Sequence, residues 1–272
     1  MILLEILKAI FLGIVQGITE WLPVSSTGHM ILVDQFLHLA GSKKFVDTFL
    51  VVIQFGSILA VLILYFEKLN PFSKRKSEKA KKATWNLWIK VLIAVLPSGI
   101  IGVLFEEQIS RIFFRPSVVA AALIVYGIIM IWIENRHRRP AITKFSQLSY
   151  KTALLIGVFQ ILALVPGTSR SGSTIIGATL LGTSRFIAAE FSFFLAIPTM
   201  LGASLLKILK AGLAFSAFEW FIMFIGSLVA FVVSVIVIKF FIGYIKKHDF
   251  KAFGVYRIIL GIIVFLYFAI AK

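Results

Sequence analysis

Cysteine is absent from the 272-residue sequence, and acidic residues are scarce. Without cysteine the chain forms no disulfide and offers no thiolate to a metal or to nucleophilic chemistry. Only 12 Asp and Glu stand against 28 Lys and Arg, which gives a formal net charge of +16. Long polar stretches that could form a soluble domain are also missing. In a chain of this kind the positive charge indicates membrane orientation and contact with anionic lipid headgroups, and we expect no nucleic-acid partner.

Apolar residues dominate what is present. They make up 60% of the chain, and the mean hydropathy is +0.99, whereas soluble domains are about 45–50% apolar. A transmembrane helix needs roughly 20 apolar residues. Six segments meet this requirement, at about 45–66, 84–105, 116–134, 186–206, 216–240 and 252–271. The sequence therefore predicts an all-α integral membrane protein in which residues 1–272 form a single membrane domain.

Two further apolar regions are interrupted. Residues 2–41 and 150–182 are broken near their middle by Pro, Gly and Ser. Broken helices at membrane depth are tolerated only where they are buried in protein or line a cavity. We therefore expect six transmembrane helices plus two re-entrant helical hairpins. The N-terminal segment lacks the basic region and cleavage site of a signal peptide, and we expect it to be retained.

Basic connections predict the orientation of the spans. Residues 67–83 carry seven Lys and Arg, residues 136–151 carry five including Arg138, and residues 239–251 carry four, whereas 106–115 and 207–215 carry two each. Cytoplasmic loops are enriched in Lys and Arg. If the rich connections are cytoplasmic, the C-terminus lies outside, the first broken region opens to the outside and the second to the cytoplasm.

The two broken regions are related to each other. A shift of 144 residues aligns Gly13 with Gly157, Gln16 with Gln160, Ser25 with Ser169 and Gly28 with Gly172. The same shift pairs FLVVI at 49–53 with FFLAI at 193–197. This indicates internal repeats at about 1–135 and 150–272. An odd number of spans after each broken segment inverts the second copy, and inverted repeats place their sites at the repeat interface.

Ionisable residues within these broken regions indicate a site. Glu20 and His29 lie in the first region and Arg170 in the second, and intramembrane ionisable groups usually mark function. If the tips of the two regions meet, these side chains converge with many hydroxyls. The hydroxyl residues are Ser25, Ser26, Thr27, Ser169, Ser171, Ser173 and Thr174. An arginine beside free N–H groups at helix N-termini suits phosphate.

Two simpler interpretations apply to parts of this pattern. Any single serine could instead hydrogen-bond a backbone carbonyl or permit close helix packing, and the GxxxG pair Gly13 and Gly17 is typical of packing. GTSRSGST at 167–174 resembles a nucleotide-binding P-loop. Ser173 stands where that motif requires Lys, and the preceding strand is missing. We therefore exclude ATP and GTP as ligands of this loop.

At the level of whole motifs, QGITEWLPVSSTGH and PGTSRSGST resemble the signature segments of bacterial undecaprenyl-diphosphate phosphatases, the bacitracin-resistance family. That family is described by an (E/Q)xxxE motif, here Gln16 to Glu20, and a PGxSRSxxT motif, here Pro166 to Thr174. The resemblance extends over the whole chain. The SRxxxxxHxxxD pattern of the other large class of lipid phosphatases does not match, because Ile176 and Phe191 occupy the histidine positions.

The resemblance implies a hydrolase that removes the terminal phosphate of undecaprenyl diphosphate, giving the lipid carrier for cell-wall synthesis. It implies a bacterial cell membrane location, a cavity open to the outer face, and a divalent cation, Mg²⁺ or Ca²⁺, bound by Glu20. Undecaprenyl diphosphate and bilayer lipids are the expected partners, and a homodimer is left open. The implied catalytic residues are Glu20, Ser26, His29 and Arg170. The implied substrate-binding residues are Gln16, Ser25, Thr27, Gly167, Thr168, Ser169, Ser171, Ser173 and Thr174.

One position departs from the family. Many members carry Glu where this chain has Gln16, and Gln supplies an oxygen without charge. A metal that relied on two carboxylates would be held more weakly here.

The sequence leaves the nucleophile and one alternative function open. Ser26 could attack with His29 as base, His29 could attack directly, or His29 could activate water. Inverted repeats with broken helices are also typical of transporters, so a transporter or flippase for polyprenyl phosphate lipids is the alternative. An imidazole beside a hydroxyl is more than anion binding requires, and this favours the enzyme.

Overall fold

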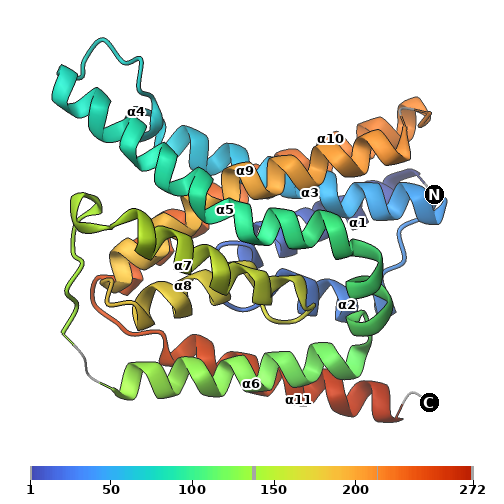
Figure 1. The fold of residues 1–272 in the computed structure, drawn as a ribbon. Helices are drawn as coiled ribbons and strands as arrows, with labels where there is room; N and C mark the ends of the chain where they lie inside the picture. The colour runs from blue at the N-terminus through green and yellow to red at the C-terminus, as the bar shows by residue number, and fades with distance from the viewer. Residues whose placement is uncertain (1, 137–138, 213, 271–272) are drawn as a thin grey trace.

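The computed structural model describes residues 2–136, 139–212 and 214–270 (Figure 1). Arg138, counted above with the second basic connection, lies outside these residues. The α-helices are α1 (Ile2–Thr19), α2 (Ser26–Phe36), α3 (Lys43–Leu64), α4 (Phe66–Leu69), α5 (Glu78–Phe113), α6 (Pro116–Asn135), α7 (Tyr150–Ile161), α8 (Arg170–Leu180), α9 (Arg185–Ala211), α10 (Ala217–Ile245) and α11 (Lys251–Ile270). Two 3₁₀ turns are η1 (Phe145–Gln147) and η2 (Leu162–Leu164). Within the described ranges the only β-type pairing is an isolated bridge between Ile142 and Thr183.

The predicted all-α class is therefore confirmed, and the number of long apolar helices is larger than expected. Seven helices are long and apolar enough to cross a membrane, namely α1, α3, α5, α6, α9, α10 and α11. Six of them correspond to the predicted spans. The seventh is α1, which the sequence placed in a broken region, and its 18 residues continue without interruption as far as Thr19. In contrast, the apolar stretch of α7 and η2 covers only Tyr150–Leu164.

The helices pack in layers around two helical hairpins. α6 lies along α11 on one side of the molecule, and α1, α3, α9 and α10 form the opposite side (Figure 1). The start of α1 and the end of α2 both lie on the side of the molecule that holds the two chain termini (Figure 1). The α7–α8 hairpin begins and ends at the other end, where the three Lys- and Arg-rich connections lie (Figure 1). Both hairpin tips reach the middle of the molecule.

Small residues allow the hairpins to approach their neighbours closely. A Cβ added at Gly13 would lie 2.6 Å from the Gly226 carbonyl oxygen of α10, and one at Gly157 would lie 2.0 Å from the Ala94 carbonyl oxygen of α5. Gly17 meets Ala230 of α10 in the same way. Any side chain at these positions would push the hairpin away from its partner helix. The packing role predicted for the GxxxG pair is thus confirmed.

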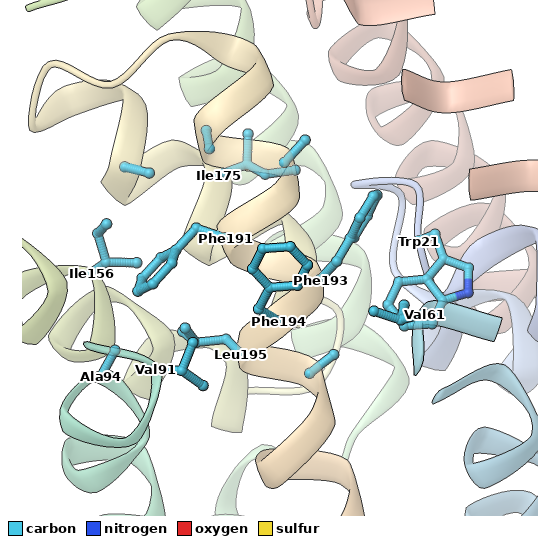
Figure 2. Packing of buried hydrophobic residues seen from close by; sticks show 14 of the residues in the cluster. Trp21, Val61, Val91, Ala94, Ile156, Ile175, Phe191, Phe193, Phe194 and Leu195 are labelled. Carbon is cyan, nitrogen blue, oxygen red and sulfur yellow. The ribbon is translucent and has the colours of Figure 1, made fainter. Parts of the chain in front are cut away.

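An aromatic core anchors the first hairpin tip against α9. Trp21, Phe193 and Phe194 are fully buried, and the rings of Trp21 and Phe193 meet edge to face with their centroids 5.3 Å apart (Figure 2). Burying a large aromatic side chain contributes on the order of 2 kcal/mol or more. Because Trp21 directly follows Glu20, this packing fixes the position of the carboxylate.

Candidate active site

Each of the two hairpin tips contains a serine N-cap with a positive φ. Ser25 precedes α2 and Ser169 precedes α8, and the two serines have φ values of 72° and 74°. Each side-chain oxygen caps its helix by accepting a hydrogen bond from the backbone N–H three residues later, at Gly28 and Gly172. Among the described residues, no other non-glycine residue has a positive φ. The predicted pairing of Ser25 with Ser169 thus corresponds to the same kind of cap, with ψ values of 97° and 123°.

This backbone conformation is unfavourable for serine. A residue held in a sparsely populated region costs about 1–3 kcal/mol and persists only where its surroundings enforce it, as happens at functional sites. A serine at the N-cap stabilises its helix by about 1 kcal/mol. Each tip therefore ends in a capped helix N-terminus, at which the first backbone N–H groups have no partner within the helix.

Glu20 is the centre of a buried polar cluster at this interface. Its side chain is 8% exposed. Oε2 accepts hydrogen bonds from Gln16 Nε2 at 2.9 Å and from Ser26 Oγ at 3.1 Å. Oε1 accepts from Arg170 Nη2 at 2.8 Å in a salt bridge. A carboxylate and an amide from the first hairpin therefore meet the guanidinium of the second, 150 residues away in sequence.

Arg170 is held on three sides. Its Nη1 donates to the Ser192 carbonyl of α9 at 2.9 Å, and its guanidinium lies over the Trp21 ring at 5.6 Å. Within the described part of the chain its Nε is buried without a hydrogen-bond partner. A buried donor without a partner is costly. The arginine is thus pre-positioned by protein groups and retains one donor that an oxygen of a ligand would satisfy.

The other hydroxyls of the PGTSRSGST segment mostly serve the backbone. Ser171 Oγ donates to the Leu22 carbonyl at 3.1 Å and so ties α8 to the first tip. Ser173 Oγ donates to the Ser169 carbonyl at 2.9 Å, and Thr174 Oγ1 lies 2.7 Å from Ser192 Oγ. The structure gives these residues packing and positioning contacts, as the simpler interpretation of such serines anticipated.

His29 is directed away from Glu20. Its Nδ1 contacts the Ser25 carbonyl at 2.8 Å, and its Nε2 contacts the Tyr256 hydroxyl of α11 at 2.6 Å. A carbonyl can only accept, so Nδ1 carries the proton and Nε2 accepts from Tyr256. The structure thus brings Glu20, Ser26, Gln16 and Arg170 into one hydrogen-bonded cluster, and it pairs His29 of α2 with Tyr256 of α11.

Arg257 of α11 is a site residue that sequence analysis missed. It is fully buried, and its guanidinium donates to the carbonyl of Pro23 at 3.1 Å and to those of Gly167 and Thr168 at 3.0 and 2.9 Å. It therefore ties the first tip to the second. The signal was available, because Arg257 is the one charged residue between Lys251 and the end of α11, and a lone intramembrane arginine usually has a role.

The remaining predicted residues lie around these contacts. Gly167 has a φ of 91°, and a Cβ there would lie 2.6 Å from the Val119 carbonyl oxygen, so a side chain would not fit. Thr168 is buried, and Thr27 is half-buried in the first turn of α2. These residues shape the two tips and flank the cluster.

The side chains around Glu20 do not by themselves supply the ligands of a cation site. Glu20 is the one carboxylate of the cluster, and it already accepts hydrogen bonds from Gln16, Ser26 and Arg170. Among the described residues no group of three His, Asp or Glu could hold a metal ion. Mg²⁺ sites use one or two carboxylates plus substrate phosphates. The divalent cation therefore stays a prediction, with Glu20 as its candidate protein ligand.

The charges of the site favour an anionic ligand. The tips hold two guanidinium groups and one carboxylate: Arg170 pairs with Glu20, and the buried Arg257 contacts backbone carbonyls of both tips. Arginine and helix N-termini both bind phosphate oxygens well. The charge and the hydrogen-bonding groups around Arg170, Ser26 and Glu20 are therefore of the kind that suits a phosphate group.

Comparison with known proteins places the chain in a family. Residues 9–263 match the family described as bacitracin resistance protein BacA. The chain is 71% identical to undecaprenyl-diphosphatase 1 of Clostridioides difficile (strain 630) over 98% of its own length and 97% of that protein. It is 59% identical to undecaprenyl-diphosphatase of Acetivibrio thermocellus, with 98% of each chain covered, and 57% identical to that of Enterococcus faecalis, again with 98% of each covered. The chain therefore belongs to the BacA family of bacterial integral membrane proteins.

Proposed function

We propose that this protein is an undecaprenyl-diphosphatase that removes the terminal phosphate of undecaprenyl diphosphate and leaves the monophosphate lipid carrier. The observation that carries the proposal is the buried contact between Glu20 of the first hairpin and Arg170 of the second, with Ser26 on the same carboxylate. Relatives of nearly equal length named undecaprenyl-diphosphatase support it. Their name favours hydrolysis over the transporter alternative.

The proposal includes an inverted repeat with two re-entrant hairpins. It is supported by the matched caps at Ser25 and Ser169 and by the opposite ends from which the hairpins enter (Figure 1). It is also supported by packing, because α1 lies along α10 whereas α7 lies along α5. α5 and α10 occupy equivalent places in the two halves. Each hairpin therefore packs against the equivalent helix of the other half, as a two-fold relation requires. The rich basic connections would face the cytoplasm, so the first hairpin would open to the outer face. We place the opening of the site on that side as part of the proposal.

Phosphate binding would rest on groups that are already in place. Phosphoryl transfer is catalysed mainly by positioning and charge stabilisation. Arg170 would hold the terminal phosphate with the N–H groups that begin α2 and α8, and Arg257 would keep the two tips at a fixed separation. Such pre-positioned donors need no reorganisation during the reaction. The polyprenyl chain would lie in the bilayer against the apolar helix surfaces.

Ser26 is the proposed nucleophile, with Glu20 in place of His29 as its base. The support is that Ser26 Oγ already donates to Glu20 Oε2 at 3.1 Å, whereas both His29 nitrogens have other partners. Oγ would form a bond to the terminal phosphorus as the bond from that phosphorus to the bridging oxygen breaks. The Ser26 proton would pass to Glu20 and then to the departing lipid phosphate. Water would next cleave the phosphoserine and restore the hydroxyl.

A divalent cation remains part of the proposal. When bound it would supply charge neutralisation to the diphosphate, and Glu20 would be its single carboxylate ligand. Because the surrounding side chains are donors, we expect the cation to arrive with the diphosphate. The assembly state, including a homodimer, stays a prediction.

The test is phosphate release from the full-length protein purified in detergent, with farnesyl diphosphate as the substrate. Detergent micelles have no two sides, so release of inorganic phosphate reports hydrolysis and excludes transport as the only activity. We expect release by the unaltered protein, loss with EDTA, and recovery with excess Mg²⁺ or Ca²⁺. If no phosphate is released with metal present, the hydrolase proposal is contradicted. If EDTA does not affect release, the proposed role of the cation is contradicted.

A further inference from the structure

A cavity with cationic lining residues lies at the basic end of the molecule, away from the hairpin tips. It has a volume of about 760 Å³ and is lined by the ends of α6, α8 and α10 and the start of α9. Its cationic lining residues are Arg136, Arg139, Arg185 and Lys246. The cavity shares α8 with the candidate active site, since Arg170 begins that helix and Thr179 lies in its last turn. Nine residues of α-helix separate the two by about 14 Å.

The acidic residues of the cavity are already paired. Arg185 forms a bidentate pair with Glu134, with Nε 2.9 Å from Oε1 and a second bond from Nη2 to Oε2. Glu134 also accepts from the Phe250 backbone N–H. Asp249 lies 3.7 Å from Lys251 Nζ. The cavity therefore keeps the positive charge of Arg136, Arg139 and Lys246, which favours an anion.

Two hydroxyls in the lining lack partners. The Oγ1 atoms of Thr179 and Thr183 are buried without a hydrogen bond among the described residues, and Thr183 is only 4% exposed. Buried polar groups are nearly always hydrogen-bonded, so each of these hydroxyls has unused capacity for a ligand oxygen. The neighbouring Ser184 caps α9. The positive end of the helix dipole lies at this N-terminus and attracts an anion.

The position along the apolar helices indicates a lipid. The cavity lies where α6 ends and α9 begins, beside Trp132, which is 55% exposed and stacks under Arg136 at 4.8 Å. Tryptophan at the end of a span is typical of the headgroup level. Basic pockets between helix ends at this level bind anionic lipid headgroups. We propose that this cavity binds the phosphate group of an anionic phospholipid through Arg139, Lys246 and the Thr183 hydroxyl.

The experiment measures thermal unfolding of the detergent-purified full chain against dioctanoyl phosphatidylglycerol at constant ionic strength. Dioctanoyl phosphatidylcholine tests the contribution of the acyl chains, and inorganic phosphate tests the free anion. We expect saturable stabilisation by phosphatidylglycerol alone at matched concentration. The double substitution Arg139→Gln with Lys246→Gln should weaken this affinity about tenfold.

Two comparisons make the result specific. Lys144→Gln with Lys247→Gln removes the same charge from exposed positions outside the cavity, and it should change the affinity by less than about twofold. Thr183→Val removes only a hydroxyl without a partner, so it should weaken lipid binding about threefold without lowering the unfolding temperature of the free protein. Equal losses in both double variants would overturn the cavity as the site.

Further outcomes separate this site from the proposed hydrolase. Arg170→Gln should leave phosphatidylglycerol binding intact, and the Arg139→Gln, Lys246→Gln variant should still release phosphate in detergent. Equal stabilisation by phosphatidylcholine, or saturation by inorganic phosphate at the same concentration, would overturn the anionic-lipid assignment. Loss of phosphatidylglycerol binding in Arg170→Gln would show that the lipid occupies the active site and would overturn the second site.

Discussion

The two hairpins share the backbone turn at their tips and differ in side-chain chemistry. Ser25 and Ser169 adopt the same φ and cap their helices through the same hydrogen bond. Their equivalent glutamines diverge, because Gln16 donates to Glu20 whereas Gln160 donates to Ser98 of α5 at 2.5 Å. The first glutamine therefore supports the polar cluster, and the second supports helix packing.

The charged groups are divided between the halves. At the shift of 144 residues, Glu20 corresponds to Leu164, and Ser26 corresponds to Arg170. One hairpin thus supplies the acid and the hydroxyl, and the other supplies the guanidinium. In the proposed inverted repeat, the two hairpins supply similar capped helix N-termini, and the difference between their side chains makes the site asymmetric.

The largest effect is expected at Ser26. Ser26→Ala removes the proposed nucleophile and should lower phosphate release about 10⁴-fold or more. Ser173→Ala is the matched control, since that hydroxyl bonds the Ser169 carbonyl within the other hairpin, and it should retain most activity. Near-normal turnover of Ser26→Ala would exclude the serine and leave His29 or water as nucleophile.

Arg170 occupies the position of the second hairpin that is equivalent to Ser26. Arg170→Gln should lower kcat about 10²–10³-fold, because it removes a charged donor from the transferred phosphate. Arg170→Lys keeps the charge without the bidentate fork and should recover only part of the rate. Steady-state phosphate release measures both variants. Full activity in Arg170→Gln would contradict its role in holding phosphate, and a thermal unfolding scan controls for loss of the fold.

Arg257 tests what joins the two tips. Arg257→Lys cannot reach the three carbonyls that Arg257 contacts on both tips. Leaving a buried carbonyl without its donor costs about 1–3 kcal/mol, so the unfolding temperature should fall and KM should rise more than kcat falls. If stability and KM are unchanged, the tips are positioned by other contacts.

The smallest effects are expected at the caps. Ser25→Ala and Ser169→Ala should each cost about 1 kcal/mol of stability, in nearly equal amounts. Glycine at either position should cost less than alanine, because glycine adopts a positive φ without strain. Chemical or thermal unfolding in detergent measures the four variants. Strongly unequal costs would show that the two tips are not equivalent.

Sequence alone predicted much of this arrangement through local patterns. Six of the seven long apolar helices and both hairpin tips followed from hydropathy and from Pro, Gly and Ser. The meeting of Glu20 with Arg170 followed from the repeat. The contact of His29 with Tyr256 was not predictable, because its partners lie 227 residues apart and no local pattern aligns α11 with α2. The length of α1 was missed because its apolar run continues directly into the broken region.

The central claim is that one diphosphate is held by groups from both hairpins, and a double-mutant cycle tests it most directly. The cycle compares kcat/KM for the unaltered protein, Glu20→Gln, Arg170→Gln and the double variant. If the two side chains act as one unit, the double variant should be within about tenfold of the Arg170→Gln variant, because the losses do not multiply. Losses that multiply fully would contradict a shared site.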